Sequence, residues 1–148
     1  TTLLNDLFGI QSRAGCSCAG PYGHQLLGID EHKAEEYRSW INRGYHGIKP
    51  GWCRVGFHYV FDEAEVDYLI SCVEFVAEHG HRFVKEYHFD ARDGRWQHRA
   101  WQEPAVTYSL QHALDGVGAS PEVLNPQARR YLYRDYLQQA EQHARRLT

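Results

Sequence analysis

Residues 62–80 read DEAEVDYLISCVEFVAEHG, and this stretch decides how the rest of the chain folds. Asp62 is a good N-cap, and Glu65 stands three residues later, at the capping-box position. Apolar side chains then recur at the i, i+3, i+4 and i+7 spacing of one helix face. They are Val66, Leu69, Ile70, Val73, Val76 and Ala77. The pattern predicts a long amphipathic helix that ends near Gly80, because glycine is typical of helix C-termini.

Residues 52–60, which read WCRVGFHYV, precede this helix and predict a β-strand. Alternate side chains of a strand point to opposite faces. One face would carry Cys53, Val55, Phe57 and Tyr59. The other would carry Trp52, Arg54, Gly56 and His58. Arg54 is therefore expected on the face opposite the apolar one.

Shorter elements are predicted on both sides of this strand and helix. Toward the N-terminus we expect a helix over residues 2–9, a strand over 10–14, a Gly- and Pro-rich loop over 15–23, and a helix capped by Asp30 that runs to about Arg43. Toward the C-terminus we expect a hairpin around Asp93-Gly94, a short helix near 105–114, and a last helix that begins at Asn125-Pro126. This irregular alternation of strands and helices favours an α+β domain over a doubly wound parallel sheet.

Composition excludes some classes of function. The formal net charge of -3 does not suggest a nucleic-acid-binding surface. No apolar run approaches the ~20 residues of a membrane span. The 148 residues contain no Met and begin at Thr1, which fits either trimming of an initiator Met or a cut from a longer polypeptide. The four cysteines come without a secretion signal, which predicts reduced thiols and a cytoplasmic location.

The loop from Arg13 to Gly23 is the most informative stretch for chemistry. Cys16 and Cys18 bracket a single residue there, and Arg13 is close enough in sequence to favour the reactive thiolate form. Three interpretations stay open: a reactive or sulfur-carrying cysteine, a small-residue turn with two inert thiols, or a metal site. The metal site would use Cys16, Cys18, Cys53 or His24, but no second Cys pair or His pair completes a zinc set.

Arg54 is the second candidate for a functional residue. Its planar guanidinium can bind a carboxylate through two parallel hydrogen bonds. The same pattern also fits an ordinary solvated arginine on the polar face of a sheet.

Both candidates lie in motifs that resemble the class V aminotransferase family, which includes cysteine desulfurases and selenocysteine lyases. The family carries Arg-Xaa-Gly-His-His-Cys-Ala where this chain reads RAGCSCA over residues 13–19. It then has a strand with Arg-Xaa-Ser and a helix opened by Thr, Ser or Asp and Glu, where this chain reads CRV and DEAE. The resemblance covers residues 1–80 and implies that Cys18 forms a persulfide. It implies that Arg54 binds the substrate α-carboxylate, and we add Arg13 as a second substrate-binding residue.

The resemblance also implies pyridoxal phosphate as cofactor, bound as a Schiff base to a lysine that follows a histidine. Lys33 follows His32, but it comes after the Cys loop, whereas the family lysine lies far before that loop. We therefore expect the cofactor lysine on an N-terminal large domain that is a partner of this chain. We expect the complete enzyme to be a homodimer. Cys16 and Ser17 replace the two family histidines, which makes a class V relative of unassigned substrate a better prediction than a true desulfurase.

The expected organisation is a small C-terminal domain of a fold-type I enzyme over residues 1–80. Its short, mostly antiparallel sheet would pack against helices. Residues 81–148 would add a hairpin and a helical extension to the same domain. An amino acid would be the substrate of the intact enzyme, by transamination, desulfuration or another lyase reaction, and this chain alone would be inactive. The alternative is a free-standing module that uses Cys16 and Cys18 as a sulfur acceptor or in an interaction.

Overall fold

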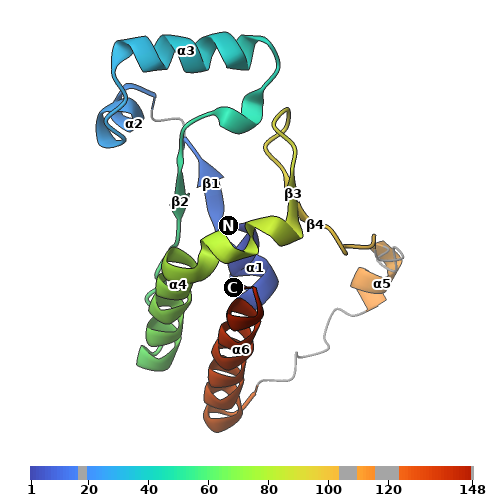
Figure 1. The fold of residues 1–148 in the computed structure, drawn as a ribbon. Helices are drawn as coiled ribbons and strands as arrows, with labels where there is room; N and C mark the ends of the chain where they lie inside the picture. The colour runs from blue at the N-terminus through green and yellow to red at the C-terminus, as the bar shows by residue number, and fades with distance from the viewer. Residues whose placement is uncertain (17–19, 104–109, 116–123, 148) are drawn as a thin grey trace.

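The computed structural model describes residues 1–16, 20–103, 110–115 and 124–147, and the fold is α+β as predicted. Most of its helices gather in two places, with a narrow waist of two strands between them (Figure 1). On one side of the waist lie α2 (Gly20–Leu26) and α3 (Glu31–Asn42). On the other lie α1 (Thr2–Phe8), α4 (Glu63–Phe83) and α6 (Pro126–Arg146). The waist consists of β1 (Arg13–Gly15) and β2 (Trp52–Arg54).

The strands that the structure describes form two separate antiparallel pairs, where one sheet was predicted. β1 pairs with β2, and β3 (Tyr87–Phe89) pairs with β4 (Trp96–His98). The β3–β4 hairpin was predicted, and Gly94 adopts a positive φ of 80° in its turn, a conformation that favours glycine. The remaining elements are short: α5 (Leu110–Asp115) and the 3₁₀ turns η1 (His46–Ile48) and η2 (Val84–Glu86).

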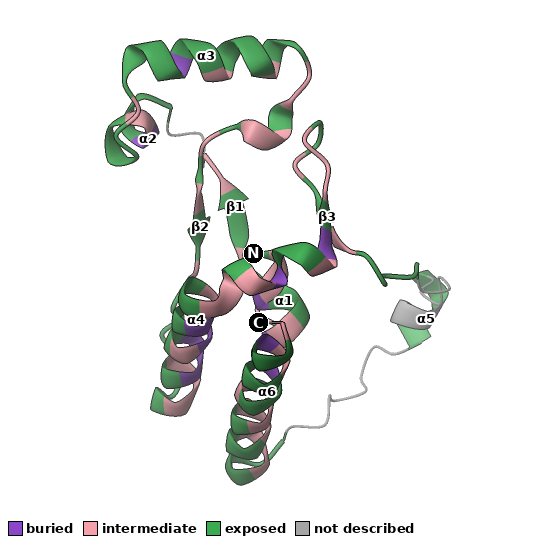
Figure 2. Cartoon of the chain, in the orientation of Figure 1, coloured by how far each residue is buried: buried purple, intermediate pink, exposed green. Residues whose placement is uncertain are grey.

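The hydrophobic core lies where α1, α4 and α6 meet (Figure 2). Its buried members are Leu4, Phe8, Tyr68, Cys72, Phe75, Phe83, Tyr87, Ala140 and Ala144. Phe8 meets the Tyr68 and Phe75 rings edge-on, with centroids 6.4 and 5.5 Å apart, and Tyr133 of α6 stacks on Tyr68 at 4.1 Å. Such aromatic pairs add to the stabilisation that burial alone provides. The small residues Ala140 and Ala144 let α6 approach this aromatic cluster closely.

The long helix α4 begins as predicted. The Asp62 side chain accepts a hydrogen bond from the Glu65 amide at 2.9 Å, and the Glu65 carboxylate accepts one from the Asp62 amide at 2.9 Å. The predicted end at Gly80 is wrong, because α4 continues to Phe83. A Cβ on Gly80 would lie 3.5 Å from Leu3 Cδ1 and 3.3 Å from Val76 Cγ1. Gly80 therefore lies on the face of α4 that meets Leu3 of α1, and a Cβ there would be tight only against the Val76 side chain.

The apolar stripe predicted for α4 is only partly the buried one. Leu69 is buried, but Ile70 and Val73 remain 43% and 41% exposed. The buried face instead presents Tyr68, Cys72, Phe75 and Phe83. Residues 66–83 carry apolar side chains on two adjoining faces, and only contact with α1 and α6 decides which of them becomes core.

Helix α6 is held at both ends by side chains. The Asn125 side chain accepts a hydrogen bond from the Ala128 amide at 2.9 Å, which confirms the predicted start. At the other end, Lys85 Nζ donates to the Leu147 carbonyl at 2.7 Å, and Arg82 donates to the Ala144 carbonyl at 3.3 Å. Cations next to the last carbonyls of a helix offset their unpaired acceptors and the negative end of the helix dipole.

Three predicted boundaries near the waist are wrong. The strand expected over 10–14 is β1 at Arg13–Gly15, and the strand expected over 52–60 ends at Arg54. Because β1 offers only three residues for pairing, the chain turns after β2, where the Phe61 amide donates to the His58 carbonyl at 3.0 Å. The loop expected over 15–23 contains the start of α2. Pro21 fits the first turn of a helix. Gly23 leaves room for the Trp52 ring, because a Cβ on Gly23 would lie 3.1 Å from that ring.

Alkaline pH should destabilise this fold through groups that are buried in their protonated form. Burial raises the pKa of the Cys72 thiol to about 11 and raises the pKa of the Tyr68 and Tyr87 hydroxyls. The unfolded chain loses these protons at lower pH than the folded chain, so their stabilisation is complete below about pH 9 and is lost as pH rises further. The free energy of unfolding should fall by up to about 1.4 kcal/mol per pH unit for each group that titrates.

Urea unfolding between about pH 8 and about pH 10.5 measures this slope. Replacing Cys72 with Ala removes one of the three groups, so the variant should lose stability less steeply with pH than the wild-type chain. Equal slopes for the two proteins would contradict the placement of Cys72 in the core.

Candidate functional site

The two motifs singled out in the sequence lie side by side in the waist. In the β1–β2 pair, Arg13 stands directly opposite Arg54, Ala14 opposite Cys53, and Gly15 opposite Trp52. Directly opposed residues of an antiparallel pair project to the same face, with Cβ atoms about 4.5–5.5 Å apart. The ladder therefore places the two arginines next to each other, although they are far apart in the chain.

Glycine permits this pairing at the end of the ladder where the Cys loop begins. A Cβ on Gly51 would lie 2.4 Å from the carbonyl carbon of Gly15 and 2.7 Å from its oxygen, closer than any side chain tolerates. Gly15 itself has a φ of 119°, which residues with a side chain rarely adopt. Any side chain at position 51 would push β2 away from β1 and separate the two arginines.

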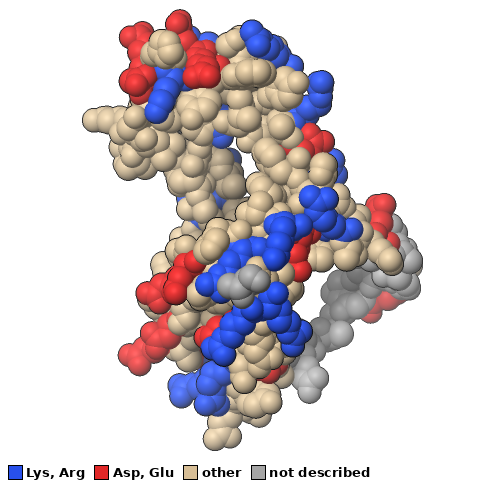
Figure 3. Space-filling model, viewed as in Figure 1, with Lys and Arg blue, Asp and Glu red and all other residues tan. Residues whose placement is uncertain are grey.

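Arg13 and Arg54 line an open cleft of about 430 Å³ together with Gln11, Ser12, Val55 and Gly56. Both arginines are exposed, and within the described ranges neither guanidinium has an ion-pair or hydrogen-bond partner. The waist also carries no acidic side chain on the face that Figure 3 shows. Two unneutralised guanidinium groups beside neutral donors such as Ser12 and Gln11 form a site that suits an anion.

The three cysteines in the described part of the chain, Cys16, Cys53 and Cys72, do not line this cleft. Cys18 lies outside the described residues, so its predicted role stays a prediction. Cys16 borders a different cavity, with His24 and Trp52, and Cys53 projects from the face of β2 opposite to Arg54. Cys72 belongs to the core, where burial raises its pKa and keeps it a thiol. Of the three cysteines in the described part of the chain, only Cys53 is exposed, and its Sγ donates to Ser12 Oγ at 3.5 Å.

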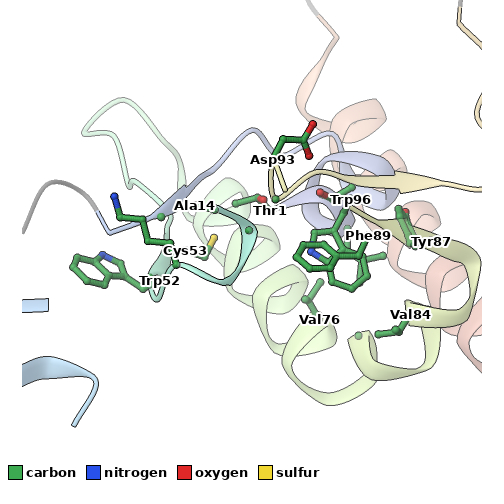
Figure 4. Close-up of a pocket in the computed structure, with 18 of the residues that line it drawn as sticks. Thr1, Ala14, Trp52, Cys53, Val76, Val84, Tyr87, Phe89, Asp93 and Trp96 are labelled. Atoms are coloured by element: carbon green, nitrogen blue, oxygen red, sulfur yellow. The ribbon is translucent and has the colours of Figure 1, made fainter. Parts of the chain in front are cut away.

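A larger cavity of about 760 Å³ lies between the waist and the β3–β4 hairpin (Figure 4). Ala14 and Cys53 border one side of it, and Phe89 and Trp96 border the other, their rings 4.7 Å apart. The lining is mainly apolar, with a few polar and titratable groups such as His46, Lys49 and Asp93.

The described residues offer neither a metal-binding cluster nor a membrane-spanning helix. There, no group of three His, Cys, Asp or Glu side chains is placed to hold a metal ion. One residue of the predicted metal set, Cys18, falls outside that part of the chain. No helix within the described ranges is both long and apolar enough to cross a bilayer.

The lysines test whether the chain can hold pyridoxal phosphate, which needs a lysine amine for its Schiff base. Lys33 is exposed on α3, Lys85 donates to the Leu147 carbonyl, and Lys49 borders the two cavities that lie outside the arginine cleft. None of the three lines the cleft of Arg13 and Arg54. The described structure therefore places no lysine of this chain at the arginine cleft, where a Schiff base with the cofactor would be needed.

Sequence reasoning selected both arginines but missed their pairing. Ser12 and Gln11, which share the cleft, were missed as well. The signal that could have found them is the antiparallel register of β1 and β2, which depends on contact between distant segments. Comparison of the chain with protein families, with curated proteins and with solved structures finds no match.

Proposed function

We propose that this chain is the small C-terminal domain of a class V aminotransferase-like enzyme that uses pyridoxal phosphate and acts on an amino acid. The reaction would be transamination, desulfuration or another lyase step. One observation carries the proposal: Arg54 and Arg13 lie opposite each other at an open cleft with no acidic partner in the described part of the chain. Arg13 and Arg54 come from the two stretches that resemble family motifs, and their juxtaposition supports the proposal.

In this proposal Arg54 binds the α-carboxylate of the substrate. Its guanidinium has a rigid fork that matches the two oxygens of a carboxylate. The cleft lining of Gln11, Ser12, Val55 and Gly56 contains no carboxylate that could hold the substrate amine. The amino group is then left directed away from the arginines, toward the cofactor in the complete enzyme.

The cofactor and its lysine would belong to a large domain that packs against the waist. The exposure of the β1–β2 ladder supports this part of the proposal. Arg13 and Arg54 on one face, and Ala14 and Cys53 on the other, are all exposed. A pair of strands that is covered on neither face is only marginally stable in water. A homodimer, which the family resemblance implies, and a cytoplasmic location, which the reduced thiols suggest, complete the proposal.

The test is to purify the product of the complete reading frame and the 148-residue chain in parallel, each after incubation with pyridoxal phosphate. We expect the complete product to retain the cofactor's visible absorbance through gel filtration, and this chain to lose it because none of its lysines lines the arginine cleft. A complete product that retains no cofactor would refute the proposed function. It would favour the alternative, a free-standing module that uses its cysteine loop.

A further inference from the structure

The arrangement of the two arginines bears on which amino acid the site accepts. Like charges directly opposite each other in an antiparallel pair destabilise it. The chain has 19 acidic and 16 basic residues, yet none of the acidic residues in its described part forms an ion pair with Arg13 or Arg54. A single carboxylate on Arg54 would neutralise one of these charges and leave the other.

We infer that the substrate carries a second anionic group, which Arg13 binds while Arg54 holds the α-carboxylate. The inference rests on the proposed function and names its substrate class: an amino acid with an acidic side chain. The two side chains start about 4.5–5.5 Å apart on one face, so each guanidinium can take one end of a short dicarboxylate.

The neutral groups of the cleft fit the same substrate. Gln11 lines the cleft with the arginines, and its side-chain amide can donate hydrogen bonds without adding charge. Ser12 also lines the cleft, but its Oγ accepts from Cys53 Sγ, on the other face of the ladder. Two cations flanked by neutral donors suit a ligand with two negative groups better than a ligand with one.

Three small anions test the inference on the 148-residue chain: succinate, monomethyl succinate and inorganic phosphate. The guanidinium N–H signals of Arg13 and Arg54 are followed by NMR during titration at low ionic strength, where screening is weak. Having two equivalent ends gives succinate about a twofold statistical advantage over its monoester. An added exposed ion pair raises the expected ratio of dissociation constants to about 3- to 10-fold in favour of succinate.

Two variants separate this inference from the proposed function. Arg13→Gln should reduce the succinate preference to about twofold, the statistical value, and leave binding of monomethyl succinate in place. Arg54→Gln should weaken binding of monomethyl succinate itself. If Arg54→Gln leaves the monoester unaffected, the proposed carboxylate site fails. If the monoester depends on Arg54 but the succinate preference survives Arg13→Gln, only the inference about the acidic substrate fails.

Phosphate distinguishes a dicarboxylate from a single doubly charged group. We expect it to bind more weakly than succinate, because one small ion cannot serve both guanidinium groups as well as two separate carboxylates can. Phosphate binding tighter than succinate would overturn the inference. The amide spectrum of each variant reports whether the fold is kept, and Arg13→Lys, which retains the charge, should keep most of the succinate preference.

Discussion

Replacing Phe83 with Ala should lower the free energy of unfolding by about 3–5 kcal/mol, the largest effect expected for a core substitution in this chain. Phe83 is 1% exposed and stands at the last turn of α4. Its ring meets Phe75 at 6.1 Å and His143 of α6 at 5.2 Å, so it joins two of the three core helices. Truncation would remove these contacts and leave a cavity that the surrounding helices cannot fill.

Urea unfolding of the variant, measured beside Val84→Ala, checks this expectation. Val84 is the next residue and is 54% exposed, so its truncation should cost no more than about 0.5 kcal/mol. A Phe83→Ala variant as stable as the Val84→Ala variant would show that α4 does not pack on α6 as described.

The sequence predicted well those features that local interactions determine. Asp62 and Glu65 complete each other's hydrogen bonds within one turn, and the start of α4 was predicted for that reason. The same holds for the cap at Asn125 and for the hairpin turn at Gly94. Each cap or turn depends on only a few neighbouring residues, so the types of those residues are sufficient to predict it.

Features that depend on contact between distant segments were predicted less well. Gly80 looked like a helix end, yet α4 continues through it to Phe83. Ile70 and Val73 were predicted to lie in the core, but α1 and α6 cover a different face of α4 and leave both side chains exposed. β2 pairs with β1 only over Trp52–Arg54, an extent that depends on a segment distant in the sequence.

The same distinction applies to the candidate site: its residues could be selected from local patterns, but their arrangement could not. Arg54 was selected from its strand pattern and its motif, and Arg13 from its motif alone. Their direct opposition follows from the register of β1 and β2, which also requires the close approach of Gly15 and Gly51. The juxtaposition of Arg13 and Arg54 thus indicates an anion site more strongly than either motif does alone.

The second large effect concerns Arg54 in the complete, cofactor-loaded enzyme. Arg54→Gln keeps a polar side chain but loses the charge and the fork that hold the substrate carboxylate. Loss of a charge-assisted hydrogen-bonded pair costs about 1.5–3 kcal/mol, so the substrate concentration for half-saturation should rise by about 10- to 100-fold. Arg54→Lys keeps the charge but not the planar fork. Its half-saturating substrate concentration should therefore lie between those of the wild-type enzyme and Arg54→Gln.

Arg95→Gln is the matched control. Arg95 is also exposed, but it pairs with Asp93 at 2.8 Å in the hairpin and does not line the cleft. Its replacement should leave half-saturation unchanged. If Arg95→Gln and Arg54→Gln shift half-saturation equally, the effect is one of general charge and not of a site.

The most direct test of the carboxylate site is therefore a single comparison in that enzyme. The concentration of L-aspartate or L-alanine that half-saturates the change in cofactor absorbance is measured for the wild-type protein and for Arg54→Gln. The site described here predicts a rise of about 10- to 100-fold for the variant with either amino acid. Half-saturation at the same concentration in both proteins would contradict it.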